Sequence, residues 1–356
     1  MVLGKIATSI EAVGLDEKGW NALVAESPTK SVFQTYQWML SWEKIFKEEC
    51  EPWCISVKDG SGIVGVGPLM ITKGFLNRRF VKFLGDGKSD YCDFLLASDR
   101  IVALENIFDH LFRAQDRWDV IELNCIPAES PTIAAIRTIC HNSGYRMLQR
   151  VLYPSPTLLI KGHREEAVKI YNKAGLRRRQ NYFERKGRLA FKTLFGSDVM
   201  PYIEQFFAQH ISRWAGTETP SLFLDERNQA FYRELVHAMS GAGWLVLSVV
   251  ELDGRPLAMH YGFDYGGRLL WYKPSFDPTQ AKHSPGLVLL RHLIGYAIEQ
   301  EREEFDLSIG DEPFKARFAN KVRETVQIKI YRDPLNFALA WSRQTLGSAR
   351  MRLVRT

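Results

Sequence analysis

The order of the expected helices and strands repeats once along the chain of 356 residues. In each half the pattern predicts a helix, a meander of three or four strands, and then a helix, a strand, a helix and a strand. A single doubly wound sheet would instead alternate strand and helix from its first element. We therefore predict an α+β (mixed α/β) fold of two tandem domains, each a mixed, mostly antiparallel sheet flanked by helices. Ser98 or Asp99 is expected to cap one first-half helix. The elements are expected at 36–46, 53–57, 63–71, 80–84, 91–96, 98–117, 119–123, 131–141 and 145–152, and again at 191–194, 200–214, 227–240, 244–250, 256–263, 268–272, 286–302, 304–308, 313–318 and 325–331.

A junction between the halves is indicated where Pro154 and Pro156 precede a long helix rich in Lys and Arg, expected from 165 past 185. We place the boundary near 160. The predicted domains are an N-terminal one at 1–160, a C-terminal one at 161–335, and a basic helix or tail at 336–356.

The composition favours a folded protein with anionic ligands. With 46% hydrophobic and 25% charged residues the chain can bury two cores of ordinary size. Its net charge of +6 suits a CoA phosphate, a nucleic acid or a membrane surface, without choosing among them. The excess is concentrated at 177–188 and 343–355, and each run could equally be a solvated helix face.

Targeting and cysteine patterns point to the cytoplasm. No run approaches the roughly 20 apolar residues of a membrane span, and the first residues lack the apolar core of a signal peptide. The cysteines form no Cys-x-x-Cys pair, so we expect reduced thiols and no metal site. They are Cys50, Cys54, Cys92, Cys125 and Cys140.

The segment 272–287 is the most informative about ligands. It joins an expected strand to an apolar helix through a loop that ends in Ser284-Pro285-Gly286. The first N–H groups of a helix have no intrahelical partner and lie at its positive end, so this junction favours phosphate. Gly286 would let a phosphate approach closely, and Lys282 and His283 could add charge or hydrogen bonds. An ordinary helix start with proline near its first position fits the same spacing.

Three segments, in this order, resemble the CelD-like acetyltransferases. These are GNAT-superfamily proteins of bacteria, often associated with cellulose or exopolysaccharide synthesis, and distant relatives of the FemAB peptidyltransferases. Residues 84–94 resemble that family's G-x-x-x-SDY segment, and the loop ending at 284–286 its Ser-Pro-Gly helix start. Residues 305–315 are similar to its FDF-x-x-GD-x-x-YK signature, with Phe314 where Tyr is usual. The resemblance spans residues 30 to 335, approximately.

This resemblance implies two GNAT domains, of which the second holds acetyl-CoA or another acyl-CoA as co-substrate. The loop departs from the general GNAT pattern Q/R-x-x-G-x-G/A, because 280–286 contains a single glycine. The N-terminal half lacks an equivalent loop, and we expect it to be structural or acceptor-binding. The candidate donor-binding residues are Lys282, His283, Ser284, Pro285, Gly286 and Leu287.

Direct acyl transfer needs a base that removes the acceptor proton and requires no nucleophilic residue. His260, in an alternating strand, has a suitable ordinary pKa, although a lone strand histidine is more often structural. Asp311 follows a short strand near which a GNAT sheet usually opens, and it could instead cap the next helix. Lys315, one turn later, could pair with Asp311 or face an anionic acceptor.

A glycine-bounded turn in the first half carries more polar side chains than a turn requires. One hypothesis is an acceptor pocket between the halves, and the alternative is a loop that bonds its own backbone. The candidate acceptor-binding residues are Asp86, Lys88, Ser89, Asp90 and Tyr91, with Asp93 nearby. Aromatic residues that could line a sugar platform, or belong to the core, are Trp38, Trp42, Trp214 and Trp271.

Three functions remain open from the sequence. The leading one is an acyl-CoA-dependent N- or O-acyltransferase, with a small-molecule or saccharide acceptor such as an envelope polysaccharide precursor. The second is a FemAB-like transferase that takes an aminoacyl group from tRNA through the basic run 177–188, although no coiled-coil arm is evident. The third is a catalytically silent scaffold of a polysaccharide-synthesis complex, held at the inner face of the membrane by the tail 337–355. The sequence does not indicate the oligomeric state.

Overall fold

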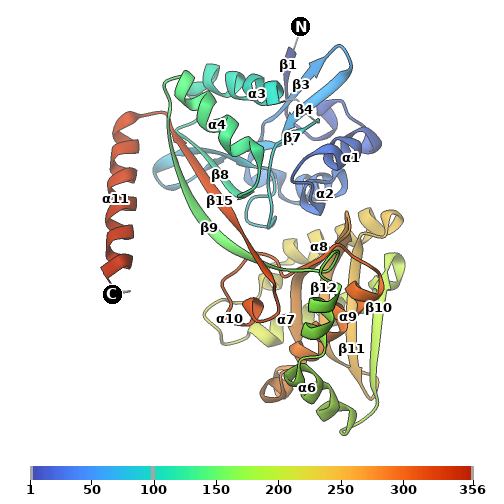
Figure 1. Ribbon diagram of the computed structural model, residues 1–356. Helices are drawn as coiled ribbons and strands as arrows, with labels where there is room; N and C mark the ends of the chain where they lie inside the picture. The colour runs from blue at the N-terminus through green and yellow to red at the C-terminus, as the bar shows by residue number, and fades with distance from the viewer. Residues whose placement is uncertain (1–2, 98–100, 354–356) are drawn as a thin grey trace. The chain divides into compact units, whose positions relative to one another are not determined.

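The computed structural model describes residues 3–97 and 101–353, with side chains at 4–97 and 101–344. The chain forms two compact units (Figure 1). The first unit contains residues up to 153 together with those from 324 onward, and the second contains 154–323. Residues 324–335, which we predicted in the C-terminal domain, therefore belong to the first unit. Ser98 and Asp99, the predicted helix cap, lie outside the described residues.

The first unit contains two sheets. One has the order β1-β3-β4-β7 and is antiparallel throughout. In the other, the order is β9-β15-β8-β6-β5-β2, with β6 and β8 parallel. The strands are β1 (Leu3–Ala7), β2 (Glu51–Pro52), β3 (Cys54–Asp59), β4 (Gly62–Gly67), β5 (Leu69–Lys73), β6 (Arg79–Phe83), β7 (Leu95–Leu96), β8 (Val120–Pro127), β9 (Arg146–Leu159) and β15 (Lys321–Tyr331). β9 and β15 carry the chain from one unit to the other.

The helices of the first unit cover these sheets. A core of buried side chains joins α3 and α4 to the strands, with Phe94, Phe108 and Trp118 at its centre. The helices are α1 (Glu17–Glu26), α2 (Tyr36–Phe46), α3 (Ile101–Arg113), α4 (Pro131–Asn142) and α11 (Pro334–Leu353). Local caps set several starts: the Asp16 side chain accepts from the Gly19 N–H to begin α1, and Thr35 begins α2 in the same way.

The second unit has one sheet, in the order β10-β11-β12-β13-β14-β9. Every pair is antiparallel except β13 with β14, which is parallel. The strands that belong to this unit alone are β10 (Leu189–Phe195), β11 (Leu245–Leu252), β12 (Arg255–Tyr265), β13 (Arg268–Phe276) and β14 (Glu304–Asp306).

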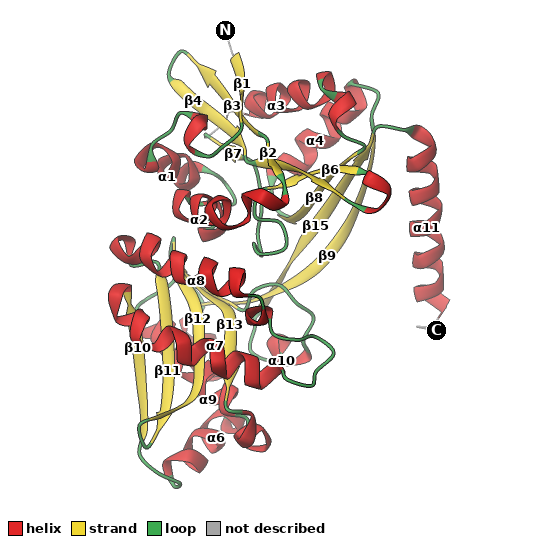
Figure 2. Cartoon of the chain, turned by 180° about the vertical axis from the view of Figure 1, so that it is seen from behind, coloured by secondary structure: helices red, strands yellow, loops and turns green. Residues whose placement is uncertain are grey.

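Helices cover both faces of this sheet. α9 packs on one face and buries Leu289 and Leu293 against Trp271. α7 packs on the opposite face, where Phe206 and Tyr261 belong to an aromatic cluster, and Figure 2 shows α7 and α9 on either side of the strands. The helices are α5 (Arg164–Tyr171), α6 (Ala174–Glu184), α7 (Met200–Trp214), α8 (Glu226–Met239), α9 (Pro285–Glu299) and α10 (Pro313–Ala316).

The predicted α+β class with two mixed, mostly antiparallel sheet domains is confirmed, and helices 36–46 and 200–214 have the predicted bounds. The prediction of a single strand at 63–71 is wrong. Pro68 divides this segment into β4 and β5, which join different sheets. The first-half meander is therefore split. The long basic helix is also divided, into α5 and α6.

The cysteines are free thiols, and four of the five are buried. Burial raises the pKa of Cys54, Cys125 and Cys140 to about 12, which keeps these thiols protonated and unreactive. Among the described residues, no helix combines the length and the apolar character needed to cross a bilayer.

Candidate active site

The sheet of the second unit opens between two parallel strands. β13 pairs with β14 only from Arg268↔Glu304 to Leu270↔Asp306. Beyond Asp306 the chain follows β9 instead, because the Leu307 N–H donates to the Pro156 carbonyl. β13, in contrast, continues to Phe276 beside β12. The two parallel strands therefore part and leave one edge of β13 unpaired by β14.

The open edge of β13 carries backbone groups of defined direction that no described strand pairs. The Asp277 N–H donates to the Leu257 carbonyl of β12, at 2.9 Å. Backbone groups alternate in direction along an antiparallel strand, so those of Ser275 also face β12. Those of Pro274 and Phe276 face the opening. Pro274 has no N–H to offer a neighbouring strand, which suits a strand edge.

The loop from β13 to α9 is a tight 3₁₀ turn, Pro278–His283, followed by a left-handed residue. The Asp277 carboxylate accepts from the Thr279 N–H and hydroxyl at 2.9 and 2.7 Å and starts the turn. Ser284 ends it with φ of 56°, a conformation that costs a non-glycine residue free energy. Pro285 then takes the first position of α9, where its missing N–H costs nothing.

Gly286 lies in the first turn of α9, where helix N–H groups have no intrahelical partner. A Cβ added at this position would lie 3.4 Å from Cδ1 of Phe276, an ordinary contact distance. The helix start therefore lies directly beside the end of the open β13 edge. Ser284 and Gly286 are both partly exposed, as an accessible binding loop requires.

Tyr182 of α6 and Lys186, which follows α6, adjoin the loop. The His283 ring stacks on Tyr182 with centroids 3.9 Å apart, and its Nε2 lies 2.8 Å from the Tyr182 hydroxyl. Desolvation, with Lys282 and Lys186 nearby, lowers the pKa of His283. Lys282 is exposed. The loop thus lies in positive surroundings, which favour an anionic group such as phosphate.

Two cationic residues that sequence reasoning missed lie on the α7 side of β13. The Arg213 guanidinium lies over the Phe276 ring, 4.2 Å from its centroid, and over Trp214 at 4.6 Å. Lys273 lies next to the opening on β13, and both cations, after burial, help to lower the pKa of His210 to about 3. The available signal was spacing, since His210, Arg213 and Trp214 lie on one face of a predicted helix.

His260 occupies a structural position. It is fully buried, its ring stacks on Trp271 with centroids 5.0 Å apart, and its Nε2 accepts from the Tyr272 N–H at 3.0 Å. Burial lowers its pKa to about 3. The lone pair that a general base would use is therefore occupied, and this geometry argues against His260 as the base.

Asp311 and Lys315 lie in the segment that follows β14. Asp311 is exposed, and it does not cap α10, because Glu312 occupies the N-cap position. Lys315 is buried, and its Nζ binds the Ile309 carbonyl at 2.7 Å and the Glu312 carboxylate at 2.9 Å. Lys315 therefore holds this loop in shape. Gly310 is needed here, since its φ is 136° and an added Cβ would lie 2.1 Å from Glu312 Oε2.

The polar turn of the first unit is tied to its own scaffold. Asp93 is buried and accepts hydrogen bonds from the hydroxyls of Thr29, Ser130 and Thr132 at 2.6–2.8 Å. Ser89 is also buried, and its hydroxyl accepts from the Trp38 indole N–H at 3.0 Å. These contacts position a loop, as buried polar groups commonly do.

The remaining candidates of this turn differ in exposure. Asp86 is paired with Lys82 at 3.3 Å and accepts from the Asn124 amide at 3.0 Å. Lys88 lies over the Phe46 ring, 5.0 Å from its centroid. Asp90 is buried, and Tyr91 is partly exposed. Their role in acceptor binding stays a prediction. The hypothesis that Trp38, Trp42 and Trp271 line a sugar platform is wrong, because all three are buried in the core.

Among the residues that the structure describes, no group of three or more His, Cys, Asp or Glu side chains is arranged to hold a metal ion.

Comparisons with known proteins agree with this geometry. Residues 172–316 match the family model described as "Acetyltransferase (GNAT) domain". That segment contains the opening between β13 and β14, the loop to α9, and Asp311. No curated protein matches the sequence.

Solved structures match over nearly the whole chain, at low identity. FemX is 10% identical, with 94% of this chain and 99% of FemX covered and a TM-score of 0.67. The C-terminal domain of a putative lysylphosphatidylglycerol synthetase from Agrobacterium fabrum is 15% identical, with coverages of 92% and 96% and a TM-score of 0.55. A tandem GNAT protein of the clavulanic acid pathway is 12% identical, with coverages of 92% and 98% and a TM-score of 0.50. The chain thus has the fold of tandem GNAT proteins, and its second unit contains a segment that matches the GNAT acetyltransferase family.

Proposed function

We propose that this protein is an acyl-CoA-dependent acyltransferase that acts directly on an amine or a hydroxyl group. The observation that carries the proposal is the parting of β13 from β14 beside the start of α9. An unpaired strand edge and a helix start, placed together, suit a long donor that has amides at one part and phosphates at another. The match of residues 172–316 to a GNAT model supports the same reading.

The residues around the opening fit such a donor. The Pro274 carbonyl and the Phe276 N–H would hydrogen-bond the amides of the pantetheine arm. The first turn of α9 around Gly286, with Lys282, would hold the pyrophosphate. In this assignment Ser284 and Pro285 shape the loop, and His283 fixes it to α6 through Tyr182.

The proposed transfer is a single displacement. The acceptor nitrogen or oxygen forms a bond to the thioester carbonyl carbon, the C–S bond breaks, and the acceptor proton passes to a base. We assign Asp311 as that base, because it is exposed in the segment that follows β14. The departing CoA thiolate then takes up a proton from solvent or from the base.

The acceptor is proposed to be a sugar or an envelope polysaccharide precursor, on the resemblance to the CelD-like family. Arg213 and Lys273, which the sequence did not suggest, lie by the end of β13 on the α7 side. They favour an acceptor that carries a negative charge. A nucleotide sugar or an acidic saccharide would satisfy both arguments.

Calorimetric titration with acetyl-CoA and longer acyl-CoAs tests the donor site. Gly286→Glu should weaken binding about 100-fold or more, because bulk and negative charge enter the phosphate position. Gly286→Ala is the matched control, and the 3.4 Å contact of its Cβ with Phe276 allows near-normal binding. Unchanged affinity in the glutamate variant, with the protein folded, would remove this loop from the donor site.

A second candidate, aminoacyl transfer from tRNA, is favoured by α6. Arg177 and Arg178 are exposed on this helix, which packs against α9. Binding of tRNA that falls steeply with salt and is lost on replacing Arg177, Arg178 and Arg179 by Gln would support it. Acyl-CoA binding that is indifferent to these replacements would favour the first proposal.

A further inference from the structure

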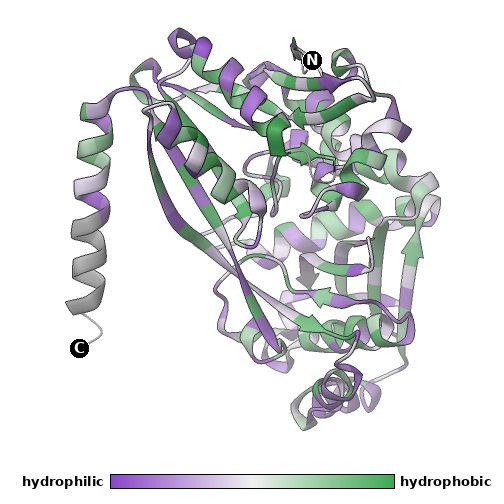
Figure 3. Ribbon diagram, turned by 45° about the horizontal axis from the view of Figure 1, so that its top comes forward, coloured by the Kyte–Doolittle hydropathy of each residue, from purple (hydrophilic) through white to green (hydrophobic). Residues whose placement is uncertain are grey.

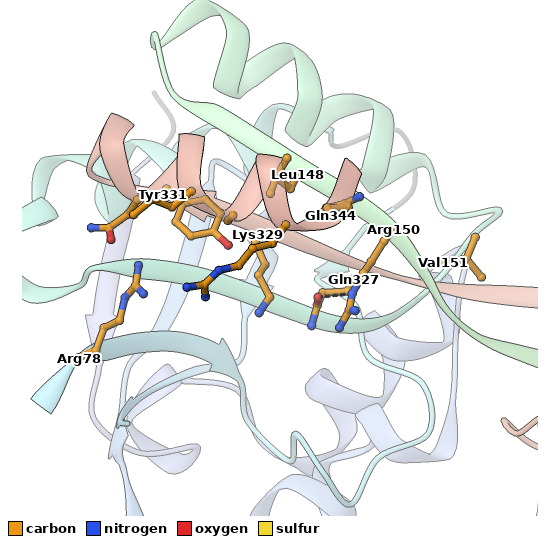
Figure 4. Close-up of a pocket in the computed structure, with 12 residues that line it drawn as sticks. Arg78, Leu148, Arg150, Val151, Gln327, Lys329, Tyr331 and Gln344 are labelled. Atoms are coloured by element: carbon orange, nitrogen blue, oxygen red, sulfur yellow. Dashed lines mark hydrogen bonds between the residues drawn. The ribbon is translucent and has the colours of Figure 1, made fainter. Parts of the chain in front are cut away.

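A basic cavity of about 710 Å³ lies in the first unit, under α11. Figure 4 shows its lining side chains, which come from α11, from β9 and β15, and from the turn before β6. Four cationic side chains contribute: Arg78, Arg150, Lys329 and Arg343. No Asp or Glu is among the described residues that line it. Such a cavity attracts an anion.

Some hydrogen-bond donors of these cations have no acceptor among the described residues. Arg78 Nη2 is buried and has no hydrogen-bond partner among the described residues. Arg150 donates only to a neutral group in the cavity, the Gln327 carbonyl oxygen at 2.7 Å. Among the described side chains, Lys329 is the one of these four cations with a carboxylate partner, Glu122, which it shares with Lys82. An anionic oxygen in the cavity would therefore complete the hydrogen bonding of Arg78, which is otherwise costly to bury.

Large apolar side chains are exposed beside these cations. Phe75 and Leu76 are 88% and 84% exposed in the turn that leads to Arg78. Leu76 and Asn77 both adopt left-handed conformations, with φ of 54° and 58°, which hold this turn in an unusual shape. Exposed apolar groups rimmed by charge mark interaction surfaces.

The described part of α11 continues the same surface. Leu335 and Leu339 are 74% and 60% exposed. Figure 3 shows hydrophilic and hydrophobic residues together on these turns. Leu339 and Arg343 line the cavity that Arg78 also lines, so the apolar and basic groups of α11 adjoin the same cavity as the turn before β6.

We propose that this face of the first unit binds a membrane surface that contains anionic phospholipid. A lipid phosphate occupies the cavity, and Phe75, Leu76 and Leu339 enter the interfacial layer. Cations beside exposed aliphatic and aromatic side chains suit an amphiphile, because a lipid can contact Leu76 and Leu339 with its apolar part while its phosphate binds the cations. The contact is peripheral, and it is independent of the acyl-donor site proposed for the second unit.

Co-sedimentation with vesicles tests the proposal. The full chain should bind phosphatidylcholine vesicles that contain phosphatidylglycerol, bind pure phosphatidylcholine weakly, and lose binding as salt rises. The double replacement Arg150→Gln and Arg343→Gln should weaken partitioning roughly 25-fold, at about fivefold per charge. Arg113→Gln with Lys169→Gln removes two exposed charges elsewhere and should leave binding unchanged.

A second pair of replacements keeps the test independent of folding. Phe75→Ser with Leu76→Ser alters side chains that are almost wholly in solvent, so the fold should be retained while vesicle binding falls. Three outcomes overturn the proposal: equal binding to neutral and anionic vesicles, full binding by both pairs of variants, or tight binding of soluble glycerol phosphate without vesicle binding.

Discussion

The two polar loops of the molecule, one in each unit, use their polar groups in opposite ways. In the first unit, Asp93 accepts from three hydroxyls and Ser89 accepts from Trp38, so side chains are committed to the scaffold. In the second, the loop before Gly286 adjoins the open edge of β13, so the backbone supplies the polar groups. Richness in polar residues therefore does not distinguish a binding site from a structural turn.

What distinguishes the two is the behaviour of the neighbouring strands. β6 of the first unit also pairs with its parallel neighbour β8 only at Phe80↔Val120 and Val81↔Ile121, but the polar turn itself fills this gap, because the Cys92 N–H donates to the Cys125 carbonyl of β8 at 3.0 Å. β13 of the second unit loses β14 halfway along. The parting creates room and unpaired backbone groups in one place, which a closed turn cannot provide.

Replacing Asp311 by Asn gives the largest expected effect. It tests the second unit, where the sheet opens between β13 and β14. If Asp311 is the base, acyl transfer should fall by about 100-fold or more, since general-base contributions are commonly of that size. The melting temperature should not change, because Asp311 is exposed and caps no helix. Release of free CoA thiol, with a panel of amino sugars and nucleotide sugars as acceptors, measures the turnover.

Glu312→Gln is the matched control, since Glu312 is the adjacent exposed carboxylate and pairs with Lys315. A modest loss in this variant with a large loss in Asp311→Asn supports the base. Equal losses would mean that both residues act by shaping the loop, and unchanged turnover in Asp311→Asn would exclude it as the base.

The sequence predicted the class of fold because periodicity and turn residues are local signals. It identified α2 and α7 to the residue, since apolar spacing and caps lie within each segment. It missed β1 and α1, and it could not find that Pro68 sends β4 and β5 into different sheets, because strand pairing depends on distant residues.

The candidate site was predictable only in part, for the same reason. The Ser284-Pro285-Gly286 helix start is a local pattern, and it could be identified from the chain alone. The parting of β13 from β14 depends on a hydrogen bond from Leu307 to Pro156, about 150 residues away. The contact of Arg213 with Phe276 is equally non-local, so helical spacing could place Arg213 beside His210 and Trp214 but could not identify Phe276 as its partner.

Replacing Asp93 by Ala tests the polar turn of the first unit, whose side chains hydrogen-bond the surrounding scaffold. Three buried hydroxyls would lose their acceptor, and we expect the first unit to lose about 3 kcal/mol of unfolding free energy. Denaturant unfolding measures this loss, and acyl-CoA affinity should stay unchanged. Asp86→Ala is the control, since Asp86 is only partly buried and pairs with Lys82, and its loss should be below about 1 kcal/mol. An Asp93 variant of normal stability and altered acceptor use would reverse the assignment.

Acidification is expected to lower the stability of the second unit more than that of the first. This is the smallest of the expected effects. Burial lowers the pKa of His210 and of His260 in the second unit to about 3, from an ordinary value of 6.5. Below pH 6.5 the unfolded chain therefore takes up protons that the folded unit cannot, and stability falls as the pH drops toward 3. At pH 5 the loss is about 2 kcal/mol for each histidine. Asp93 acts in the opposite direction, because burial raises its pKa and the folded first unit accepts that proton more readily.

Calorimetry at pH 7 and pH 5 measures this difference, and His210→Gln identifies its source. Glutamine can still hydrogen-bond the Ser221 hydroxyl, which lies 2.8 Å from Nδ1 of His210, but it does not titrate. The variant should therefore lose about 2 kcal/mol less than the parent protein between the two pH values. His237→Gln, at an exposed position of α8, should keep the parental dependence. If His210→Gln keeps it too, His210 is not held neutral in the folded unit, and the acid sensitivity must come from groups outside the aromatic cluster.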